Sequence, residues 1–559
     1  YNPLSCQEKI EIPRKCPKDS PEFPFKGNPI NITNGAKTQT ETDFIGDGED
    51  PLKIVRHYNT TPITQGLELP KPFEEEKFTA FEGDEMLCSG GIYSETTSAG
   101  SRSSNNREWK IVAPSACPIL IVYKPSGAKI VYAKMSNPPG PGHWYASNDP
   151  KDGRIQHYAS WYNYYDGSGK RYEFSRYMQL KYIRQGSKLT RFNYSGSLLT
   201  SYVNAYGRTL NYYYDAEGRN TSIKTPNGDY YKYTYDNNDN IIEVIYPDDT
   251  PSDDSDNPRK HYLFEDTRFL KALTGIIDES GNRYASWSYD QYGRAISSEH
   301  DSGVDKTEIE YIDGYSTRVK EYVNDTQYKE TVYQFSRSGG KNQITSVEPA
   351  VCQNCSVGNA QYSYDPVTGN ILQKIDENGI ITSYEYDENN KEIKRTHAVG
   401  TSDEYIVETV WDASLSKPLA VTEPGRVMAY TYDTEGMMLT KRVTDAVTLE
   451  FRETTYSYNS KKALTSVNGP RVDVTDTTTY TYNPQGYKTS ETNALGHTTT
   501  YSYHDSNGRA GQITDPNGVI TYLTYNKKGQ LISRTTNGQT TQLEYDSVGN
   551  LIQATAPDG

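Results

Sequence analysis

The chain has 559 residues, a formal net charge of −15 and only 34% hydrophobic residues, with 50 Tyr against 12 Phe. The acidic balance argues against nucleic acid as a partner, and no apolar run approaches the roughly 18 residues that a membrane-spanning helix needs. Mean hydropathy is −0.83, but an aromatic content of 12% argues against a disordered chain, because disordered segments are poor in aromatic residues.

The N-terminal third lacks a clear repeat. Residues 1–27 are predicted to be a Pro-rich, charged leader that contains Cys6 and Cys16. Residues 28–190 are predicted to be a β domain, with short strands before residue 60, an irregular segment at 60–110 and better strands at 119–123 and 128–132. The chain begins at Tyr1 without a signal peptide, which we interpret as a mature or trimmed form.

The six cysteines fall into three local pairs: Cys6 with Cys16, Cys88 with Cys117, and Cys352 with Cys355. Local pairing predicts three disulfides and an oxidising compartment. The alternative for the last pair is a zinc half-site or a redox pair. A zinc ribbon needs a second such pair at suitable spacing, and a thioredoxin-like site needs a βαβ context, so a disulfide on a loop insertion is favoured.

Residues 191–559 carry a repeat in which Tyr-x-Tyr-Asp is followed by a glycine turn. The second Tyr recurs at 432, 458, 482, 503, 525 and 545, in steps of 26, 24, 21, 22 and 20 residues. A fixed period of this length is typical of stacked structural units. The repeat residues predicted to be structurally important are Tyr235, Asp236, Tyr386, Asp387, Tyr432, Asp433, Tyr545 and Asp546.

Each repeat predicts a hairpin. Aromatic residues alternate with Thr, Ser or Glu before the turn, so the tyrosines share one face of a strand. Asp or Asn opens the turn through its side chain, and Gly three residues later supplies a positive φ. A second turn, such as Asp515-Pro516-Asn517-Gly518, closes the unit. Rows of Tyr replace an aliphatic core, and their hydroxyls tolerate partial wetting.

The number of hairpins predicts a curved, all-β fold. A period near 21 over residues 190–559 gives about 17 hairpins and about 35 strands, whereas open twisted sheets rarely exceed about 10 strands without curling. Such a ribbon must spiral or close, and a large closed sheet encloses space. An acidic insertion at 247–260 interrupts the array.

The Tyr-Asp-x-x-Gly repeats resemble the YD or Rhs repeats of bacterial polymorphic toxins, which also build the shells of insecticidal Tc toxin complexes and the barrel of animal teneurins. The stretch from Gly27-Asn28-Pro29 through Glu41-Thr42-Asp43-Phe44 to Arg56-His57-Tyr58-Asn59 resembles the domain that precedes the repeats in bacterial Rhs proteins. The resemblance covers about residues 27–559 and implies an all-β array wound into a spiral, hollow, barrel-like shell around a C-terminal toxin.

The sequence departs from this family near its end. Complete members carry a plug motif and an aspartyl autoprotease there, whereas this chain stops at Ala556-Pro557-Asp558-Gly559, still in repeat register. We therefore expect a partial shell or one part of a larger assembly. The implied partners are a C-terminal toxin domain or further shell segment beyond Gly559 and a secretion-apparatus component, in a secreted or periplasmic bacterial setting.

For the other candidate sites, structural roles are favoured over functional ones. His504 is predicted to occupy the Asp position of one repeat, and His57 is predicted to be packed rather than catalytic. The Asp-rich stretch at 248–256 could offer calcium ligands, but it lacks the EF-hand order, so a solvated loop is favoured. Trp144 and Trp161 lie among tyrosines that could stack on sugar rings, with inward packing favoured.

Three functions remain in competition. The first is a non-enzymatic encapsulation scaffold that sequesters a toxic domain until delivery. The second is an extracellular adhesion or carbohydrate-binding module. The third, an enzyme, is disfavoured because no nucleophile constellation, phosphate-binding loop or zinc motif occurs. The sequence predicts no catalytic residue, no cofactor and no metal.

Overall fold

The computed structural model describes residues 25–60, 110–112, 119–123, 129–135, 141–147, 153–158, 160–166, 170–250, 253–324, 326–338, 341–351, 359–412 and 415–558. These residues form strands almost throughout, with one 3-10 turn, η2 (Asp301–Gly303). The prediction of an all-β fold is confirmed. Within the same ranges, no helix has the length and hydropathy needed to cross a membrane.

The first half of the chain contributes β1 (Phe25–Lys26), β2 (Ile30–Asn31), β3 (Thr38–Ile45), β4 (Lys53–Asn59), β5 (Lys110–Val112), β6 (Ile119–Tyr123), β7 (Lys129–Lys134), β8 (His143–Ala146), β9 (Arg154–Tyr158), β10 (Trp161–Tyr165), β11 (Arg171–Ser175), β12 (Leu180–Gln185), β13 (Lys188–Ser195), β14 (Leu198–Val203), β15 (Thr209–Tyr214), β16 (Asn220–Lys224), β17 (Tyr230–Tyr235), β18 (Ile241–Ile245), β19 (Arg259–Leu263), β20 (Gly275–Ile277), β21 (Arg283–Tyr289) and β22 (Ala295–His300).

The second half contributes β23 (Thr307–Tyr311), β24 (Ser316–Asn324), β25 (Gln327–Ser338), β26 (Lys341–Val351), β27 (Ala360–Tyr364), β28 (Ile371–Ile375), β29 (Ile381–Tyr386), β30 (Glu392–His397), β31 (Tyr405–Trp411), β32 (Pro418–Glu423), β33 (Arg426–Tyr432), β34 (Met438–Asp445), β35 (Phe451–Tyr458), β36 (Leu464–Asn468), β37 (Thr477–Tyr482), β38 (Lys488–Thr492), β39 (Thr498–Ser502), β40 (Gln512–Thr514), β41 (Ile520–Tyr525), β42 (Leu531–Thr536), β43 (Gln539–Tyr545) and β44 (Leu551–Thr555).

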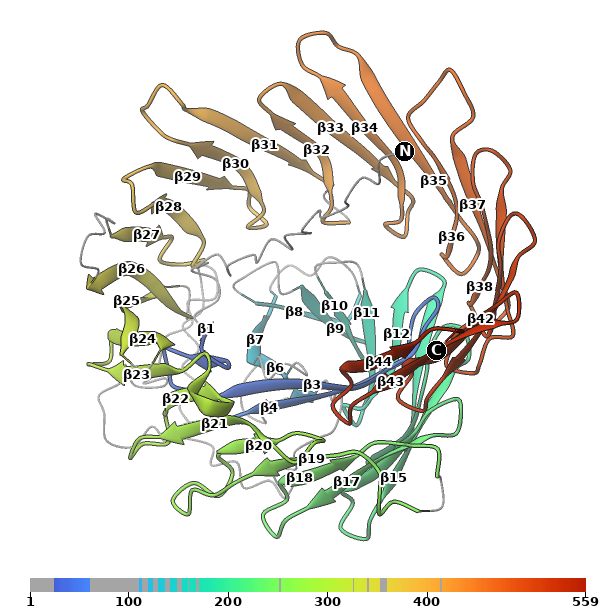
Figure 1. Ribbon diagram of the computed structural model, residues 1–559. Helices are drawn as coiled ribbons and strands as arrows, with labels where there is room; N and C mark the ends of the chain where they lie inside the picture. The colour runs from blue at the N-terminus through green and yellow to red at the C-terminus, as the bar shows by residue number, and fades with distance from the viewer. Residues whose placement is uncertain are drawn as a thin grey trace, which may run out of the picture.

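The strands β5 to β44 form one continuous antiparallel sheet in which each strand pairs with the next along the chain. The sheet bends round into a ring, and its last strands return to the side where β12 and β15 lie (Figure 1). The ladder passes through β13 without a break, so a domain boundary at residue 190 stays a prediction.

Turns that are far apart in the sequence contact each other where the sheet overlaps itself. The Ser187 hydroxyl donates to the Ser460 carbonyl at 2.6 Å, and the Lys527 ammonium lies 3.2 Å from the Asp229 carboxylate. The strand order places β44 next to β5, as in a closed ring. Among the described strands, however, no residue of β44 is paired with a residue of β5. We therefore describe the sheet as a spiral whose layers touch at their turns, rather than as a barrel closed by a strand ladder.

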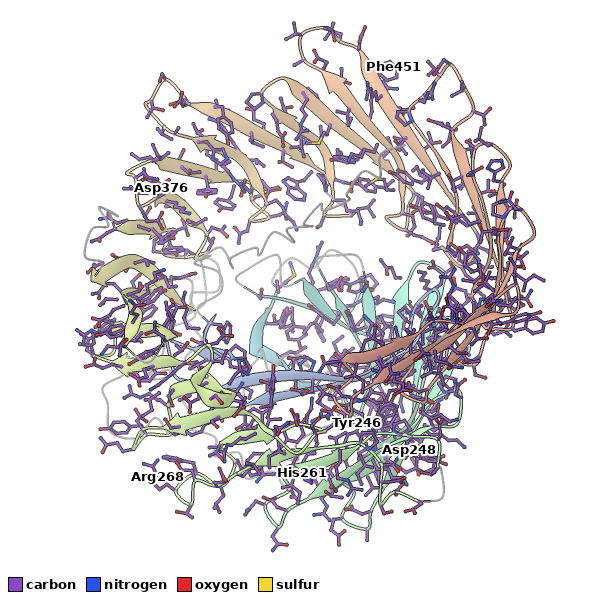
Figure 2. All side chains as sticks on the ribbon, in the orientation of Figure 1. Tyr246, Asp248, His261, Arg268, Asp376 and Phe451 are labelled. Carbon is purple, nitrogen blue, oxygen red and sulfur yellow. The ribbon has the colours of Figure 1, made fainter. Side chains whose placement is uncertain are left out.

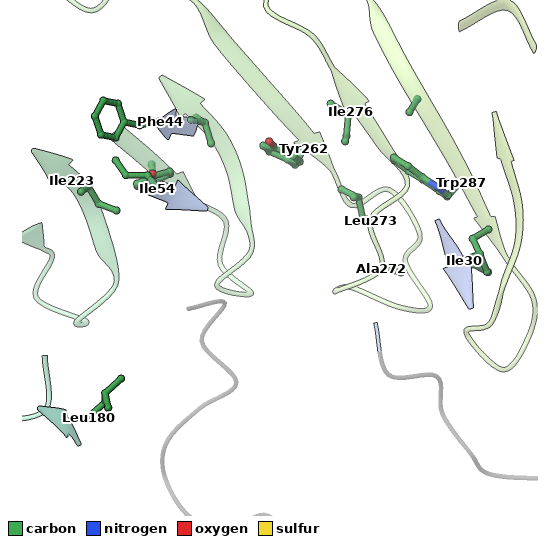
Figure 3. Close-up of a cluster of buried hydrophobic side chains, with 14 of the residues drawn as sticks. Ile30, Phe44, Ile54, Leu180, Ile223, Tyr262, Ala272, Leu273, Ile276 and Trp287 are labelled. Atoms are coloured by element: carbon green, nitrogen blue, oxygen red, sulfur yellow. The ribbon is translucent and has the colours of Figure 1, made fainter. Parts of the chain in front are cut away.

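The N-terminal hairpin β3–β4 and the short pair β1–β2 lie inside the ring, against the concave face of the sheet (Figure 1). Their apolar side chains bury that face: Phe44 and Ile54 lie beside Ile223, and Ile30 lies beside Trp287 (Figure 3). This contact forms part of the hydrophobic core, and burial of large aromatic and aliphatic side chains is the dominant stabilising term in folding.

The core is confined to the first part of the ribbon. All fully buried members of the cluster lie between Ile30 and Tyr362. From β28 onward the strands carry only half-buried and exposed side chains, and in Figure 2 the described side chains of this part do not reach across the middle of the ring. The two parts therefore share one architecture but differ in what covers the concave face.

Candidate functional surface of the wall

The repeat unit is built around one tyrosine and one turn residue. The Tyr235 hydroxyl donates to the carbonyl of Asn220 in the preceding hairpin at 2.7 Å. Asp236 follows and accepts the backbone amides of Asn238 and Asn240 through Oδ1, both at 2.8 Å. A bulge between Thr234 and Tyr235 re-aims the tyrosine, as bulges do. The tyrosine thus fastens one repeat to the previous one, and the aspartate closes the turn.

The same two contacts recur along the wall. The Tyr432 hydroxyl donates to the Pro418 carbonyl at 2.9 Å and the Tyr545 hydroxyl to the Leu531 carbonyl at 3.0 Å. Asp387, Asp433 and Asp546 each accept backbone amides of their own turns, and Tyr386 is half-buried at the end of β29. The same hydroxyl contact is made by Tyr214, Tyr289, Tyr311, Tyr364, Tyr458, Tyr482 and Tyr525.

We call this hydroxyl contact the tyrosine latch. It was not anticipated from the sequence, although the recurring tyrosine before each turn marks its position. The acceptor carbonyl lies in the return strand of the preceding hairpin, 14 to 20 residues earlier. In one repeat Trp411 replaces the tyrosine, and its Nε1 donates to the Glu392 carbonyl at 2.8 Å. This position therefore requires an aromatic ring with a hydrogen-bond donor at its far end, and Phe has no such donor.

Removing one latch hydroxyl should weaken the wall measurably. Tyr432→Phe is expected to lower the free energy of unfolding by about 1 kcal/mol, because the Pro418 carbonyl loses its donor in a half-buried site. Urea denaturation measures the change. The control is Tyr522→Phe, since Tyr522 is 52% exposed and should change stability by less than about 0.5 kcal/mol. Equal effects of the two substitutions would rule out the latch.

The turn aspartates should make the wall acid-sensitive. The Thr448 and Val447 amides hold the pKa of Asp445 below its usual value, and the Asn550 side chain and backbone do the same for Asp546. A lowered folded-state pKa stabilises the fold above the unfolded pKa of about 3.9, and this stabilisation is lost as pH falls through the folded pKa. Tm should therefore decline below about pH 4.

The matched variant is Asp445→Asn/Asp546→Asn, because Asn459 and Asn483 already accept turn amides through their side-chain oxygens. Differential scanning calorimetry should show a shallower acid decline for the double variant than for the unaltered chain. A Tm at pH 3 equal to that at pH 6 in the unaltered chain would contradict the assignment.

The structure corrects the prediction for His504. The turn carboxylate is Asp505, whose Oδ1 accepts the amides of Asn507 and Arg509, each at 2.9 Å. One extra residue has been accommodated before the turn: Tyr503 adopts φ +53° and is 78% exposed. His504 instead stacks on Tyr487 at 5.3 Å, and burial lowers its pKa.

The other residues considered as sites do not come together into one binding or metal site. Trp144 stacks on Tyr165 at 5.7 Å, whereas Trp161 is 39% exposed rather than packed inward. In the acidic insertion Asp254 pairs with Lys232, and no group of three His, Cys, Asp or Glu residues that could hold a metal occurs in the described ranges. Cys6, Cys16, Cys88, Cys117, Cys352 and Cys355 all lie outside the described residues.

A buried polar cluster holds the hairpin β3–β4 on the wall. Arg56 donates to both carboxylate oxygens of Asp43, at 2.7 and 2.9 Å, and to the Tyr262 hydroxyl at 2.6 Å. Tyr233 donates to Asp43 at 3.0 Å. Burial raises the pKa of Tyr233 and of Tyr246 well above the usual value, so both hydroxyls keep their protons. The ion pair is therefore satisfied within the interface.

The concave face beyond this cluster can be followed by register, because directly opposed residues in an antiparallel pair share a face. Starting from Tyr233 opposite Val244, the ladder leads strand by strand to the following concave pairs: Tyr362 with Lys374, Tyr384 with Arg395, Tyr430 with Lys441, Tyr456 with Val467, Tyr480 with Glu491, and Tyr501 with Ile513. We call the concave face of β28–β44 the open wall.

The open wall combines rings, hydroxyls and charges. Its tyrosines are half-buried, and several carry a cation over the ring, such as Arg395 at 5.3 Å from the centre of Tyr384. Threonines lie two residues before the tyrosines on the same strands, for example Thr382 and Thr454. A surface of this kind can contact both apolar and polar groups.

Comparisons with known proteins agree with the repeat. The RHS Repeat model matches residues 214–251, 488–520 and 525–559. A domain of unknown function, DUF6531, matches residues 27–68, which include the hairpin β3–β4. No curated protein sequence matches the chain.

Among solved structures, the chain is similar to TcdB2-TccC3-Cdc42, with 10% identity over 77% of this chain and 23% of that one and a TM-score of 0.35. For TcdB2-TccC3 without the hypervariable C-terminal region, the values are 12%, 77%, 22% and 0.36. For a Photorhabdus luminescens Tc holotoxin pore they are 11%, 79%, 27% and 0.31.

The chain spans about a quarter of the length of these solved chains. The family is indicated instead by the three matched repeat segments and by the DUF6531 match before them. Between and beyond those segments the structure shows the same hairpin, bulge and tyrosine latch, as at Tyr432 and Tyr458. The chain therefore carries RHS repeats and is similar to Rhs/YD-repeat proteins.

Proposed function

We propose that this chain is a non-enzymatic scaffold, part of a β-shell that sequesters a C-terminal toxic polypeptide until delivery. The observation that carries the proposal is the open wall. In the first part of the ribbon the same concave face is buried under β1–β4, whereas from β28 onward its tyrosines stay half-exposed. A concave aromatic surface without a cover among the described residues is suited to a polypeptide occupant.

The chemistry of the open wall favours polypeptide over lipid or nucleic acid. Tyr offers an apolar ring together with a hydroxyl, and the neighbouring Lys374, Arg395 and Lys441 provide cations. The chain as a whole is acidic, with a net charge of −15, which opposes binding of nucleic acid. The proposed action is steric: the wall separates the enclosed segment from its targets.

The proposed occupant is the polypeptide that follows Gly559, or a further shell segment that carries it. We place the assembly in a secreted or periplasmic bacterial setting, where a secretion-apparatus component would handle it. That setting would also permit a disulfide within each of the three local cysteine pairs.

Site-specific photo-crosslinking tests this function. A photoreactive phenylalanine is placed at Tyr430 on the open wall or at Thr431, the neighbouring exposed residue on the opposite face, in the chain expressed with the polypeptide that follows Gly559. Cross-links to that polypeptide are expected from position 430 and not from 431. Equal cross-linking from both positions, or none from either, would contradict enclosure.

The alternative, a carbohydrate-binding adhesion module, rests on one exposed aromatic group. Trp161 is 39% exposed and Tyr158 is 54% exposed, and β9 and β10 are paired so that the two residues face each other across the turn. Binding on a glycan array that is lost in Trp161→Ala and kept in Trp144→Ala would favour this reading. Absence of glycan binding in the unaltered chain would exclude it.

A further inference from the structure

The loop between β3 and β4 lies in the seam where the ribbon overlaps itself. On one side it contacts the turn after β14. The Asn204 side-chain amide donates to the Asp50 carbonyl at 2.7 Å, and the Ala205 amide donates to the Asp50 carboxylate at 3.0 Å. Arg208 donates to the carbonyls of Asp47, Glu49 and Asp50. The inner layer thus binds the loop mainly through its backbone.

On the other side the same loop contacts the outer layer. The Asp47 amide donates to the Asn507 carbonyl at 2.7 Å, and the Glu49 amide donates to the Gly486 carbonyl at 3.0 Å. These acceptors belong to the turns after β39 and β37, 460 and 437 residues further along the chain than Asp47 and Glu49. Five residues of the N-terminal hairpin therefore join two layers that no strand ladder connects among the described residues.

The turn that receives the loop begins with Asn204, whereas the turns at 215–219 and 290–294, which also end in arginine, begin with aspartate. In the next repeats the arginine at the same position pairs with the aspartate of its own turn: Arg219 with Asp215 and Arg294 with Asp290, both at 2.7 Å. In the turn that receives the loop, Asn204 stands where the other two turns have aspartate. Asn204 still accepts the turn amides but carries no charge. Arg208 is therefore free to bind the loop, and it is only 6% exposed there.

The fit leaves no room for a side chain at the tip of the loop. Gly48 adopts φ +79°, and a Cβ atom there would lie 2.8 Å from the Tyr487 ring and 3.0 Å from the Gly486 carbonyl. Arg208 also lies over the Tyr487 ring, at 5.0 Å from its centre. Inner turn, loop tip and outer turn are packed together as one unit.

We infer that the N-terminal hairpin is a clasp: its loop at residues 46–50 fastens the outer layer of the ribbon onto the inner one, and the shell opens at this seam when the loop is released. Asn204 and Arg208 are the socket of the clasp. The inference concerns how the wall is held together, and it stands whether or not a toxin is enclosed.

Asn204→Asp tests the socket. The aspartate keeps the turn, because Asp serves it in the next repeats, but it pairs with Arg208 and removes the donor to Asp50. Hydrogen exchange followed by mass spectrometry is expected to show at least tenfold faster exchange at residues 47–49 and in the turns at 483–487 and 505–509. Small-angle scattering should show a larger maximum dimension. Asn493→Asp makes the same change in an exposed turn and should alter neither readout.

Gly48→Ala tests the clasp from the loop side. It leaves the socket intact, but it places a methyl group against Tyr487 and Gly486. The same seam segments should exchange faster, while the strands of the buried core keep their protection and circular dichroism stays unchanged. If either variant folds and its seam exchanges at the rate of the unaltered chain, the clasp is wrong.

Discussion

Replacing Arg56 with methionine is expected to lower the free energy of unfolding by about 3–5 kcal/mol, the range found when one partner of a buried ion pair is removed. The Asp43 side chain is fully buried and Arg56 is its ion-pair partner, 2.7 Å away. Without the guanidinium, a carboxylate would remain in the interface with only tyrosine hydroxyls as donors. The hairpin β3–β4 should then detach from the concave face or bind it weakly.

A double-variant cycle separates this effect from loss of packing. Asp43→Asn/Arg56→Met removes both charges and should recover most of the stability that Arg56→Met loses, because replacing a buried pair with neutral groups is often close to neutral. Chemical denaturation followed by tryptophan fluorescence measures all members of the cycle, with Trp287 as a reporter near the hairpin. A single variant as stable as the unaltered chain would show that the pair does not hold the hairpin.

The same substitution on the two parts of the wall should have very different costs. Tyr231→Ala is expected to cost about 3–5 kcal/mol, as for other large aromatic side chains removed from a core. Tyr231 is 1% exposed and lies 5.8 Å from Phe44 and 6.1 Å from Tyr246, measured between ring centres. Removing its ring would leave a cavity between hairpin and wall.

Tyr480→Ala is the counterpart on the open wall and should cost only about 1 kcal/mol, the ordinary value for a half-exposed position. Tyr480 is half-buried and lies opposite Glu491. Thermal denaturation of both variants gives the comparison. Equal costs would mean that the concave face of β28–β44 is covered as thoroughly as that of β17, which would remove the basis for the proposed occupant.

The local chemistry of the repeat was predictable from the sequence. Asp and Gly act within a few residues of each other, so Asp433 with Gly436 predicts the turn that the structure contains, with φ +83° at the glycine. Where glycine is absent, Asn390 and Lys462 adopt the same positive φ. The curvature also followed from the number of hairpins, because a long twisted sheet must curl.

Contacts between distant residues were not predictable in the same way. Nothing near Asp43 in the sequence indicates that it binds Tyr233, which lies 190 residues away. The role of Asn204 becomes visible only when its turn is compared with the turn at Asp215 and both are seen beside the N-terminal loop. His504 was misplaced because one inserted residue shifts the turn to Asp505, and a pattern read at fixed spacing cannot show which residue is extra.

The central claim is that the ribbon forms a curved wall whose open face holds a polypeptide. Cryo-electron microscopy of the chain expressed with the polypeptide that follows Gly559 tests it most directly. The account predicts a ring with overlapping layers at the β12–β44 side and additional density against the concave face of β28–β44. A flat or solid particle, or a ring whose following polypeptide lies wholly outside it, would contradict the account.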